Sequence, residues 1–509
     1  MTETKEDENV HPILQGFLFV LHPMHFPFLF IGVGLGILVG ALPGLTASVG
    51  IILLLPFVFY LDVSTAMVML CGAFCGGIYG GSISAILIST PGTPSAAATV
   101  LDGFPLAQKG EAGKAIGVAT ISSTIGGIIS TFCLMFFAPK LAQIALKFGP
   151  EEYFALTVFG LTVIASVAGR ALTKGLIAGF FGLLIATVGI DPIEGYARYS
   201  FDIPNLMGGF SLLPVLIGLF AISQIFVQIE NVGKDIKRYD QKIGKLMPSI
   251  SELKKLFPII ISSSFLGTFI GIIPGTGGTI AAFLAYNEAK RWSKNPDSFG
   301  KGNLAGIAAP EAANNGTTGG AMVPMLTLGI PGDVVTAVML GCLLLIGLKP
   351  GPLLFQESPD VVSAIFAGLL LANVMILILG VVSVRIFPKV LKVRPSVLFP
   401  IIFTLCFLGA FSLNNSTYDM FIALVFGVVG YLMQKTGFPA APVVLGIILG
   451  PIAEDALARS LIISHGNWGI LFKSPLALFF YAISILSVAY SLVRQFSAIK
   501  ATTKKTDIK

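Results

Sequence analysis

The chain has 509 residues, of which 55% are hydrophobic and only 11% are charged, and its formal net charge is +6. Soluble domains carry about 25% charged residues, so this composition excludes an ordinary soluble protein and indicates a polytopic helical membrane protein. The Lys and Arg residues lie in short stretches between apolar runs, without interleaved aromatic residues, so no nucleic-acid partner is expected.

The N-terminal part of the chain predicts a hairpin in the membrane. Residues 1–11 form an acidic segment that lacks the basic leader and the cleavage site of a signal peptide, so we expect it to be retained. The apolar stretch FPFLFIGVGLGILVGALPGLTASVGIILLLPFVFY is then divided into two arms by Pro43-Gly44. Because no Lys or Arg occurs between Lys5 and Lys109, we expect a re-entrant hairpin that enters from the side away from the cytoplasm.

A broken helix should follow this hairpin. Residues 64–104 would form one helix about 60 Å long, roughly twice the hydrocarbon thickness, so the helix must break, tilt or end early. Pro91 and Pro94 each remove an N–H donor, which places the break in the sequence STPGTP. Freed backbone groups are tolerated in a bilayer only where protein or an aqueous cavity satisfies them. The break therefore indicates either a binding site or a packing kink.

Basic residues set the expected orientation of the segments that follow. A basic linker at 230–256 should be cytoplasmic, and the chain should reach it through crossings near 115–137, 153–169, 175–189 and 207–229. Between this linker and the basic residues near 290–301 lies a second apolar stretch, which Pro274-Gly275 divides into two arms. This stretch should form a hairpin that enters from the cytoplasmic side.

The second hairpin begins a second copy of the same plan. Four residues of the first copy correspond to four of the second at constant spacing and without gaps. The pairs are Gly76 and Gly316, Gly80 and Gly320, Pro91 and Pro331, and Gly92 and Gly332. We therefore expect an all-α fold of two inverted repeats, residues 12–229 and 257–495, each with a re-entrant hairpin and a broken helix. A basic cytoplasmic tail should follow at 496–509. Region 440–475 fits this plan least well, because Arg459 and Lys473 would lie outside.

The breaks have the chemistry of sites for charged solutes. An unwound stretch presents carbonyl groups to a cation, and the helix that begins after it presents N–H groups and a positive dipole end to an anion. Side-chain oxygens near the breaks are hard donors that suit Na⁺. They belong to Ser89, Thr90, Thr93, Ser95 and Thr99 in the first copy and to Thr327, Asp333 and Thr336 in the second.

The stretch APEAANNGTTGG at 309–320 places an acidic residue in an apolar setting. Glu311 precedes Asn314 and Asn315 by about one helical turn. An intramembrane carboxylate is a functional candidate. The alternative is that Glu311 lies at the cytoplasmic end of its helix and faces water.

Long motifs carry a resemblance to a known family. The sequences ALPGLTASVGIILLLPF, YGGSISAILISTPG, LDGFPLAQKGEAGKA, IPGTGGTIAAFLAYNEAKR, APEAANNGTTGGAMVPMLTLGIPGDVVTAVM and LGIILGPIAEDALARSLIIS are similar to the large membrane subunit of tripartite tricarboxylate transporters. The similarity covers nearly the whole chain. It implies a permease of the bacterial inner membrane that imports an organic di- or tricarboxylate on a cation gradient. It also implies a small four-helix membrane subunit and a periplasmic solute-binding protein as partners, and an elevator-type movement.

The breaks and the resemblance together define a candidate site with no cofactor. We expect the carboxylate at Gly44, Thr46, Ser48, Gly81, Ser82, Thr90, Gly92, Thr93, Ser95, Thr276, Asn314, Asn315, Gly332, Asp333 and Thr336. We expect Na⁺ at Pro43, Thr46, Ser89, Pro91, Pro274, Thr276, Thr279, Asn315 and Pro331. Relatives commonly have NIPGE where this chain has STPGT, which argues against citrate as the substrate. Asp333 stands where a small neutral residue is expected, and it partly replaces the lost charge.

Two other classes of membrane protein stay open. An intramembrane enzyme would need a reactive cluster, but the four histidines form no H-E-x-x-H pattern. A channel for a small anion would share the Gly and Ser content, although it would not need paired breaks around a closed site. An ATP-driven pump is disfavoured because GEAGKA at 110–115 lacks the spacing of a phosphate-binding loop.

Overall fold

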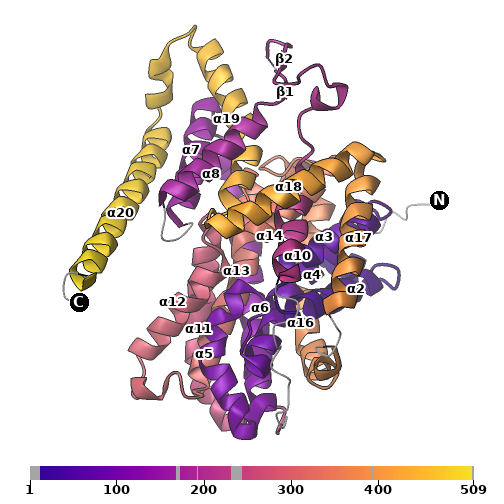
Figure 1. Ribbon diagram of the computed structural model, residues 1–509, viewed down its shortest axis with the longest axis vertical. Coiled ribbons are helices and arrows are strands. Elements are labelled where there is room, and N and C mark those ends of the chain that lie inside the picture. Colours follow the sequence, from indigo (N-terminus) through magenta and orange to yellow (C-terminus); the bar gives the residue numbers. More distant parts are fainter. Residues whose placement is uncertain (1–11, 168–171, 192, 231–243, 391–394, 507–509) are drawn as a thin grey trace.

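The computed structural model describes residues 12–167, 172–191, 193–230, 244–390 and 395–506 (Figure 1). Of the expected segments, residues 1–11, residues 231–243 of the basic linker and residues 507–509 of the tail lie outside these ranges. The described chain is helical apart from one short antiparallel pair, in which β1 (Gly189–Ile190) lies beside β2 (Ala197–Arg198). This pair departs from the all-α expectation and interrupts the connection between two membrane segments.

The helices follow the order that the apolar runs indicate. The first half contains α1 (Pro12–Leu21), α2 (Phe26–Ala41), α3 (Ala47–Val58), α4 (Val63–Ile88), η2 (Pro94–Ala96), α5 (Ala97–Leu106), η3 (Ala107–Glu111), α6 (Ala112–Ala145), α7 (Pro150–Val167), α8 (Leu172–Ala186), η4 (Pro204–Leu206), α9 (Leu212–Leu216), η5 (Ile217–Ile222) and α10 (Ser223–Ile229). The second half contains α11 (Ile250–Ile272), α12 (Gly277–Arg291), η6 (Pro296–Ser298), α13 (Ala305–Leu328), α14 (Val334–Leu345), α15 (Leu354–Glu357), α16 (Pro359–Val390), α17 (Pro395–Asn414), α18 (Thr417–Thr436), α19 (Ala441–Ile463), η7 (Trp468–Phe472) and α20 (Pro475–Thr506).

Many of these helices can cross a bilayer. Within the described ranges, seven helical segments are long and apolar enough to span a membrane, and the number is eight if α1 and α2, which meet at an angle of 77°, form one span. A span needs about 20 apolar residues, a length that these segments reach. The chain is therefore a multi-pass membrane protein, as the composition predicts.

All four expected breaks are present. Helix α4 ends at Ile88, and Ser89 has a left-handed φ of 58°. Helix α13 ends at Leu328, and Gly329 has a φ of 69°. At the two hairpin tips, Gly44 and Gly275 have φ values of 83° and 78°. Each prolyl residue at a break lacks an N–H donor, and each left-handed residue turns the chain, so the helices end where the sequence predicts.

Helices α2 and α3 form an antiparallel pair beside α4. Gly32 lies against Met69 and Gly40 lies against Gly77, so α2 runs parallel to α4. Ala47, at the start of α3, also lies against Gly77, and a short turn joins the end of α3 to the start of α4. The chain therefore reverses direction at Pro43-Gly44.

Helices α11 and α12 repeat this arrangement beside α13. Gly271 of α11 and Gly278 of α12 both lie against Thr317, and Tyr286 at the far end of α12 lies against Gly306. Corresponding residues make corresponding contacts in the two copies. A Cβ at Gly36 would lie 2.5 Å from the carbonyl oxygen of Ala73, and a Cβ at Gly267 would lie 2.1 Å from that of Ala313. Glycine allows this close helix packing in both copies.

The broken helices α4 and α13 run in opposite directions. Helix α6 runs parallel to α13, because contacts occur in the same order along both helices, at Ser123–Glu311 and Ser130–Gly319. It runs antiparallel to α4, because Thr120 bonds to Tyr79 and Gly127 approaches Asn373, which bonds to Cys75. Helices α4 and α13 are therefore antiparallel to each other.

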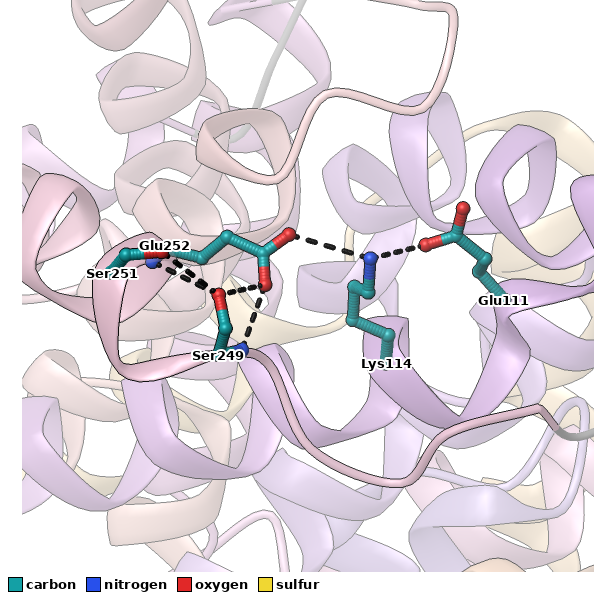
Figure 2. Close-up of polar contacts among 5 residues, drawn as sticks. All are labelled: Glu111, Lys114, Ser249, Ser251 and Glu252. Atoms are coloured by element: carbon teal, nitrogen blue, oxygen red, sulfur yellow. Dashed lines mark hydrogen bonds and ion pairs between the residues drawn. The ribbon is translucent and has the colours of Figure 1, made fainter.

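One end of the molecule gathers charged residues from both copies. Lys114, at the start of α6, pairs with Glu111 at 2.5 Å and with Glu252 at 3.3 Å (Figure 2). Glu252 also forms a capping box with Ser249 at the start of α11 (Figure 2). Lys109 donates to the carbonyl of Lys301 at 2.6 Å. The loops that the sequence places on the cytoplasmic side therefore lie at the same end.

A second group of helices lies beside the broken helices. Helix α19 packs on α7 and α8, and α20 packs on α7 (Figure 1). On the other side, α18 packs on η5 and α17. In each of these two contacts, of α19 with α8 and of α18 with η5, a helix of the second half packs on a helix of the first half.

Candidate functional site

The tips of the hairpins lie beside the breaks of their own copies. The backbone N–H of Gly275 donates to the carbonyl oxygen of Gly332 at 2.7 Å. In the first copy, a Cβ at Gly92 would lie 1.9 Å from the carbonyl oxygen of Gly40, which is close to the first tip. Only glycine fits at this distance, because the backbones are in direct contact.

Each hairpin also reaches the break of the other copy. Helix α12 packs on η2 and α5, which follow the first break, and α3 packs on α14, which follows the second. A Cβ at Gly278 would lie 3.2 Å from the Cβ of Ser95 and 2.4 Å from Oδ1 of Asn314. The second hairpin, the first break and α13 therefore meet around Gly278.

Unpartnered polar atoms lie at this meeting point. Asn314, which lies against Gly278, and the adjacent Asn315 are 0% exposed, yet within the described part of the chain both side-chain polar atoms of Asn314 and Oδ1 of Asn315 have no hydrogen-bond partner. A buried amide atom without a partner costs about 1–3 kcal/mol, and such atoms are rare in folded proteins. Asn314 lies in the middle of α13 and faces Gly278 at the start of α12, so its polar atoms are available to a ligand at this place.

A small cavity of about 70 Å³ lies between the second hairpin tip and the second group of helices. Its walls are formed by Phe220, Gly275, Gly277, Asp333, Val334, Ala337, Ala441, Val444 and Leu445. Most of the lining is apolar, and Asp333 is its one acidic group among the described residues. The cavity joins the broken elements to α19.

The N-terminus of α14 is already occupied by a carboxylate of the chain. Asp333 accepts hydrogen bonds from the backbone N–H of Thr336 at 2.8 Å and from its hydroxyl at 2.8 Å. The two residues form a capping box, because the Thr336 hydroxyl oxygen also accepts from the N–H of Asp333. The N-terminus of α14 is therefore less favourable for a bound anion than the N-termini of η2 and α5, which have no side-chain cap.

Several predicted site residues engage each other or their own backbone. Thr93 and Ser95 are buried and bond to each other at 3.0 Å, and Thr46 and Ser48 do so at 2.7 Å. Other hydroxyls donate to nearby carbonyl groups, namely Ser82 to Tyr79, Thr90 to Ile88, and Thr276 to Ile270 and Ile273. Gly81 lies against Thr93, and its carbonyl accepts from the N–H of Gly92 at 3.2 Å.

The remaining predicted residues differ in their exposure. Thr90 is exposed, and Gly44 lies against the side chain of Gln228 on α10. Pro331 is buried, whereas Pro43, Ser89, Pro91 and Thr279 are half-buried. The structure therefore brings Ser95, Gly278, Asn314 and Thr317 together, and it places Thr90 at the surface.

Glu311 lies inside the protein, and the alternative that it faces water is wrong. Its side chain is 0% exposed, because α5, α6 and α13 enclose it. The hydroxyl of Thr99 donates to Oε1 at 2.5 Å, and the hydroxyl of Ser123 donates to Oε2 at 2.9 Å.

Asp102 is a second buried carboxylate, which the sequence did not single out. Its Oδ1 accepts from four consecutive backbone N–H groups, those of Gly300, Lys301, Gly302 and Asn303, at 2.7–3.1 Å. Its Oδ2 accepts from the hydroxyl of Tyr286 at 2.9 Å. The residue fastens α5 to α12 and to the loop before α13. The sequence could have indicated Asp102, because it is a lone acidic residue in an apolar segment and is followed by Gly and Pro.

Comparison with known proteins finds one family profile and two relatives of this chain. The sequence profile of the tripartite tricarboxylate transporter TctA family matches residues 26–445. A curated protein of Agrobacterium vitis, named as an uncharacterized 52.8 kDa protein in the TAR-I ttuC' 3' region, is 36% identical over 94% of this chain and 95% of its own length. A second protein of that organism, from the TAR-II ttuC' 3' region, is 34% identical over 45% of this chain and 94% of its own. No solved structure matches.

Proposed function

The chain belongs to the tripartite tricarboxylate transporter TctA family of permease subunits, and on this premise we propose that it imports an organic carboxylate together with Na⁺. The observation that carries this proposal is the pair of amide atoms of Asn314 that have no partner among the described residues and that lie beside the start of α12 and the first break. Such atoms need a polar ligand, and the surrounding backbone breaks supply donors and acceptors for one.

The carboxylate is proposed to bind at the first break. The helix that begins at Pro94 directs its N–H groups and positive dipole end toward this break, and Thr93 and Ser95 add hydroxyl groups. The amide of Asn314 faces the same place from α13. Asp333 makes the second helix end less favourable for an anion, which supports a substrate with fewer carboxylates than citrate.

The cation is proposed to be Na⁺. Carbonyl and hydroxyl oxygens predominate around the four breaks, and such hard donors suit an alkali cation. A Na⁺ gradient supplies about 2.3 kcal/mol per charge for each 100 mV of membrane potential, in addition to the concentration term. The contribution of the potential depends on the net charge of the ions and the acid that move together.

The movement is proposed to be that of an elevator built from two inverted repeats. The opposite directions of α4 and α13 support inverted repeats, and so do the matching glycine contacts of the two hairpins. The broken helices pack on one another across the copies, whereas α7, α8, α19 and α20 pack mainly among themselves. In this proposal the hairpins and the broken helices move as one body, and α7, α8, α19 and α20 form part of the scaffold.

The permease is proposed to work in the inner membrane of a bacterium, with a small four-helix membrane subunit and a periplasmic solute-binding protein. The tripartite description of the family supports partner subunits, and the multi-pass architecture is compatible with them.

Reconstitution of the three subunits in liposomes tests the proposal. An inward Na⁺ gradient should drive accumulation of an organic acid that the binding protein recognises, and dissipation of the gradient should stop it. Counterflow of labelled substrate should occur, because alternating access requires it. Uptake of the acid without counterflow and without any dependence on an ion would indicate a channel and contradict the proposal.

A further inference from the structure

Glu311 is an intramembrane carboxylate without a basic partner in the described part of the chain. The ion pairs found there do not include it, and its oxygens are held by the hydroxyl groups of Thr99 and Ser123. An ionised carboxylate that is removed from water costs several kcal/mol, and a hydrogen bond to a charged group returns about 1.5–3 kcal/mol. A positive charge beside Glu311 would offset the desolvation cost that the hydrogen bonds leave uncompensated.

The donors around Glu311 define the class of cation. The carboxylate contributes two oxygens, and Thr99 and Ser123 contribute one hydroxyl oxygen each. One turn along α13, Asn315 has a buried Oδ1 without a partner. Residues four apart on a helix lie on the same face, so this amide oxygen is within reach of the same place. Oxygen donors with a single negative charge suit a monovalent hard cation rather than a transition metal.

We propose that Glu311, Thr99 and Ser123 bind the coupling Na⁺ ion, with Oδ1 of Asn315 as a further ligand. This inference rests on the proposed function only in its statement that the ion drives uptake. The Glu311 carboxylate and one Na⁺ ion together are neutral, so the ion would remove the unpaired charge of Glu311 from the low-dielectric membrane interior.

The position of Thr99 explains how the ion acts on the substrate site. Thr99 lies on α5, which continues directly from η2, and η2 contains Ser95. The ion would fix α5 against α6 and α13, and it would thereby hold Ser95 beside Gly278 and Asn314. Ion binding therefore prepares the first break for the carboxylate, which is the coupling that symport requires.

Thermal melting of the purified permease tests this assignment directly. The melting temperature should rise with NaCl at fixed pH, with choline chloride keeping the ionic strength constant and no organic acid present, because a ligand that binds only the folded state stabilises it. The Glu311→Gln variant should lose this rise. The Thr99→Val variant, which keeps the side-chain shape, should need about tenfold more Na⁺ for half of the effect, equivalent to about 1.4 kcal/mol of binding energy.

Glu288→Gln is the matched control, because Glu288 lies on α12 with a partly exposed side chain that bonds to Trp292. This variant should respond to Na⁺ like the unmodified protein.

If Glu311→Gln fails to fold, Thr99→Val and Ser123→Ala carry the test. A Na⁺ response of Glu311→Gln or of both hydroxyl variants equal to that of the unmodified protein would overturn the assignment. So would an unmodified protein that responds to pH but not to Na⁺. If the proposed function were wrong and the ion site right, the result would be different. The melting temperature would still rise with Na⁺, but no organic acid would accumulate in liposomes.

Discussion

Gly275 and Gly332 are joined by a backbone hydrogen bond of 2.7 Å, although they lie at the tip of a hairpin and at the break of another helix. The bond requires close approach of two backbones. A Cβ at Gly332 would lie 2.5 Å from the Cα of Ala321, so this position has no room for a side chain. The second hairpin and the second break therefore form one unit.

Replacement of Gly332 by Leu should abolish uptake. The new side chain would separate the break from α13, and overpacking of this kind costs about 1–3 kcal/mol of stability without preventing insertion into the membrane. Uptake in liposomes and gel filtration in detergent measure the two effects. Gly34→Leu is the control, because Gly34 has open space around its Cα. Normal uptake by Gly332→Leu would show that the break is only a packing kink.

Replacement of Asn314 by Leu should separate binding from stability. Both polar atoms of the Asn314 side chain lack partners, so removing them should leave the melting temperature unchanged or higher, because about 1–3 kcal/mol of desolvation cost disappears. Binding of the organic acid, measured by calorimetry in the presence of Na⁺, should be lost.

Asn303→Leu serves as the contrasting variant. Asn303 donates to Ser298 at 2.7 Å and accepts from the N–H of Ala305 at 2.8 Å, so its replacement should lower the melting temperature. If Asn314→Leu were the variant that destabilised the protein and it still bound the acid, the amide would have a structural role.

The sequence predicts the breaks well because proline and glycine act locally. Pro43, Pro91, Pro274 and Pro331 mark breaks whatever surrounds them, since each lacks an N–H donor. The repeat was also visible, because corresponding glycines keep the same spacing in both copies.

The contacts between the copies were not predictable in the same way. Thr99 and Glu311 are 212 residues apart, and their pairing depends on how α5 packs against α13. The capping of α14 by Asp333 was missed because a carboxylate near a break has two possible roles, binding a solute or satisfying its own helix. The short strand pair at β1 and β2 was missed because two-residue strands leave no alternating pattern.

The opposite orientation of the two hairpins can be tested by labelling. Tyr60, between α3 and α4, is 86% exposed, and Trp292, at the end of α12, is 79% exposed. In a background without the native cysteines, a cysteine at position 60 should react with an impermeant maleimide added outside intact cells. A cysteine at position 292 should react only after the membrane is opened. Outside labelling of both positions would contradict the inverted arrangement.

Asp102 should hold the first broken helix to the second hairpin. Asp102→Asn removes the charge that four backbone N–H groups and Tyr286 bind, and charged hydrogen bonds contribute about 1.5–3 kcal/mol each. The melting temperature should fall clearly, and α5 should become more accessible to protease. Asp297→Asn, at an exposed position in η6, should change neither measurement. An unchanged melting temperature in Asp102→Asn would show that this contact does not stabilise the fold.

The strand pair should weaken in acid because of Asp191. Hydrogen bonds from the backbone N–H groups of Glu194 and Ile193, together with the nearby Arg198, lower the pKa of Asp191 from its ordinary value of 3.8. Arg198 lies 3.0 Å from Asp191 and also pairs with Glu454, so it links the strand pair to α19.

A carboxyl group with a lowered pKa in the folded state stabilises the fold above its unfolded pKa, and this contribution disappears as the pH falls through the folded value. The melting temperature of the unmodified protein should therefore exceed that of Asp191→Asn near pH 7, and the difference should shrink as the pH falls below about 4 and vanish only below the lowered pKa of the folded state. Glu194→Gln, at an exposed position, should show no such convergence. A difference that stays constant down to about pH 3 would mean that the ionised form of Asp191 contributes nothing to stability.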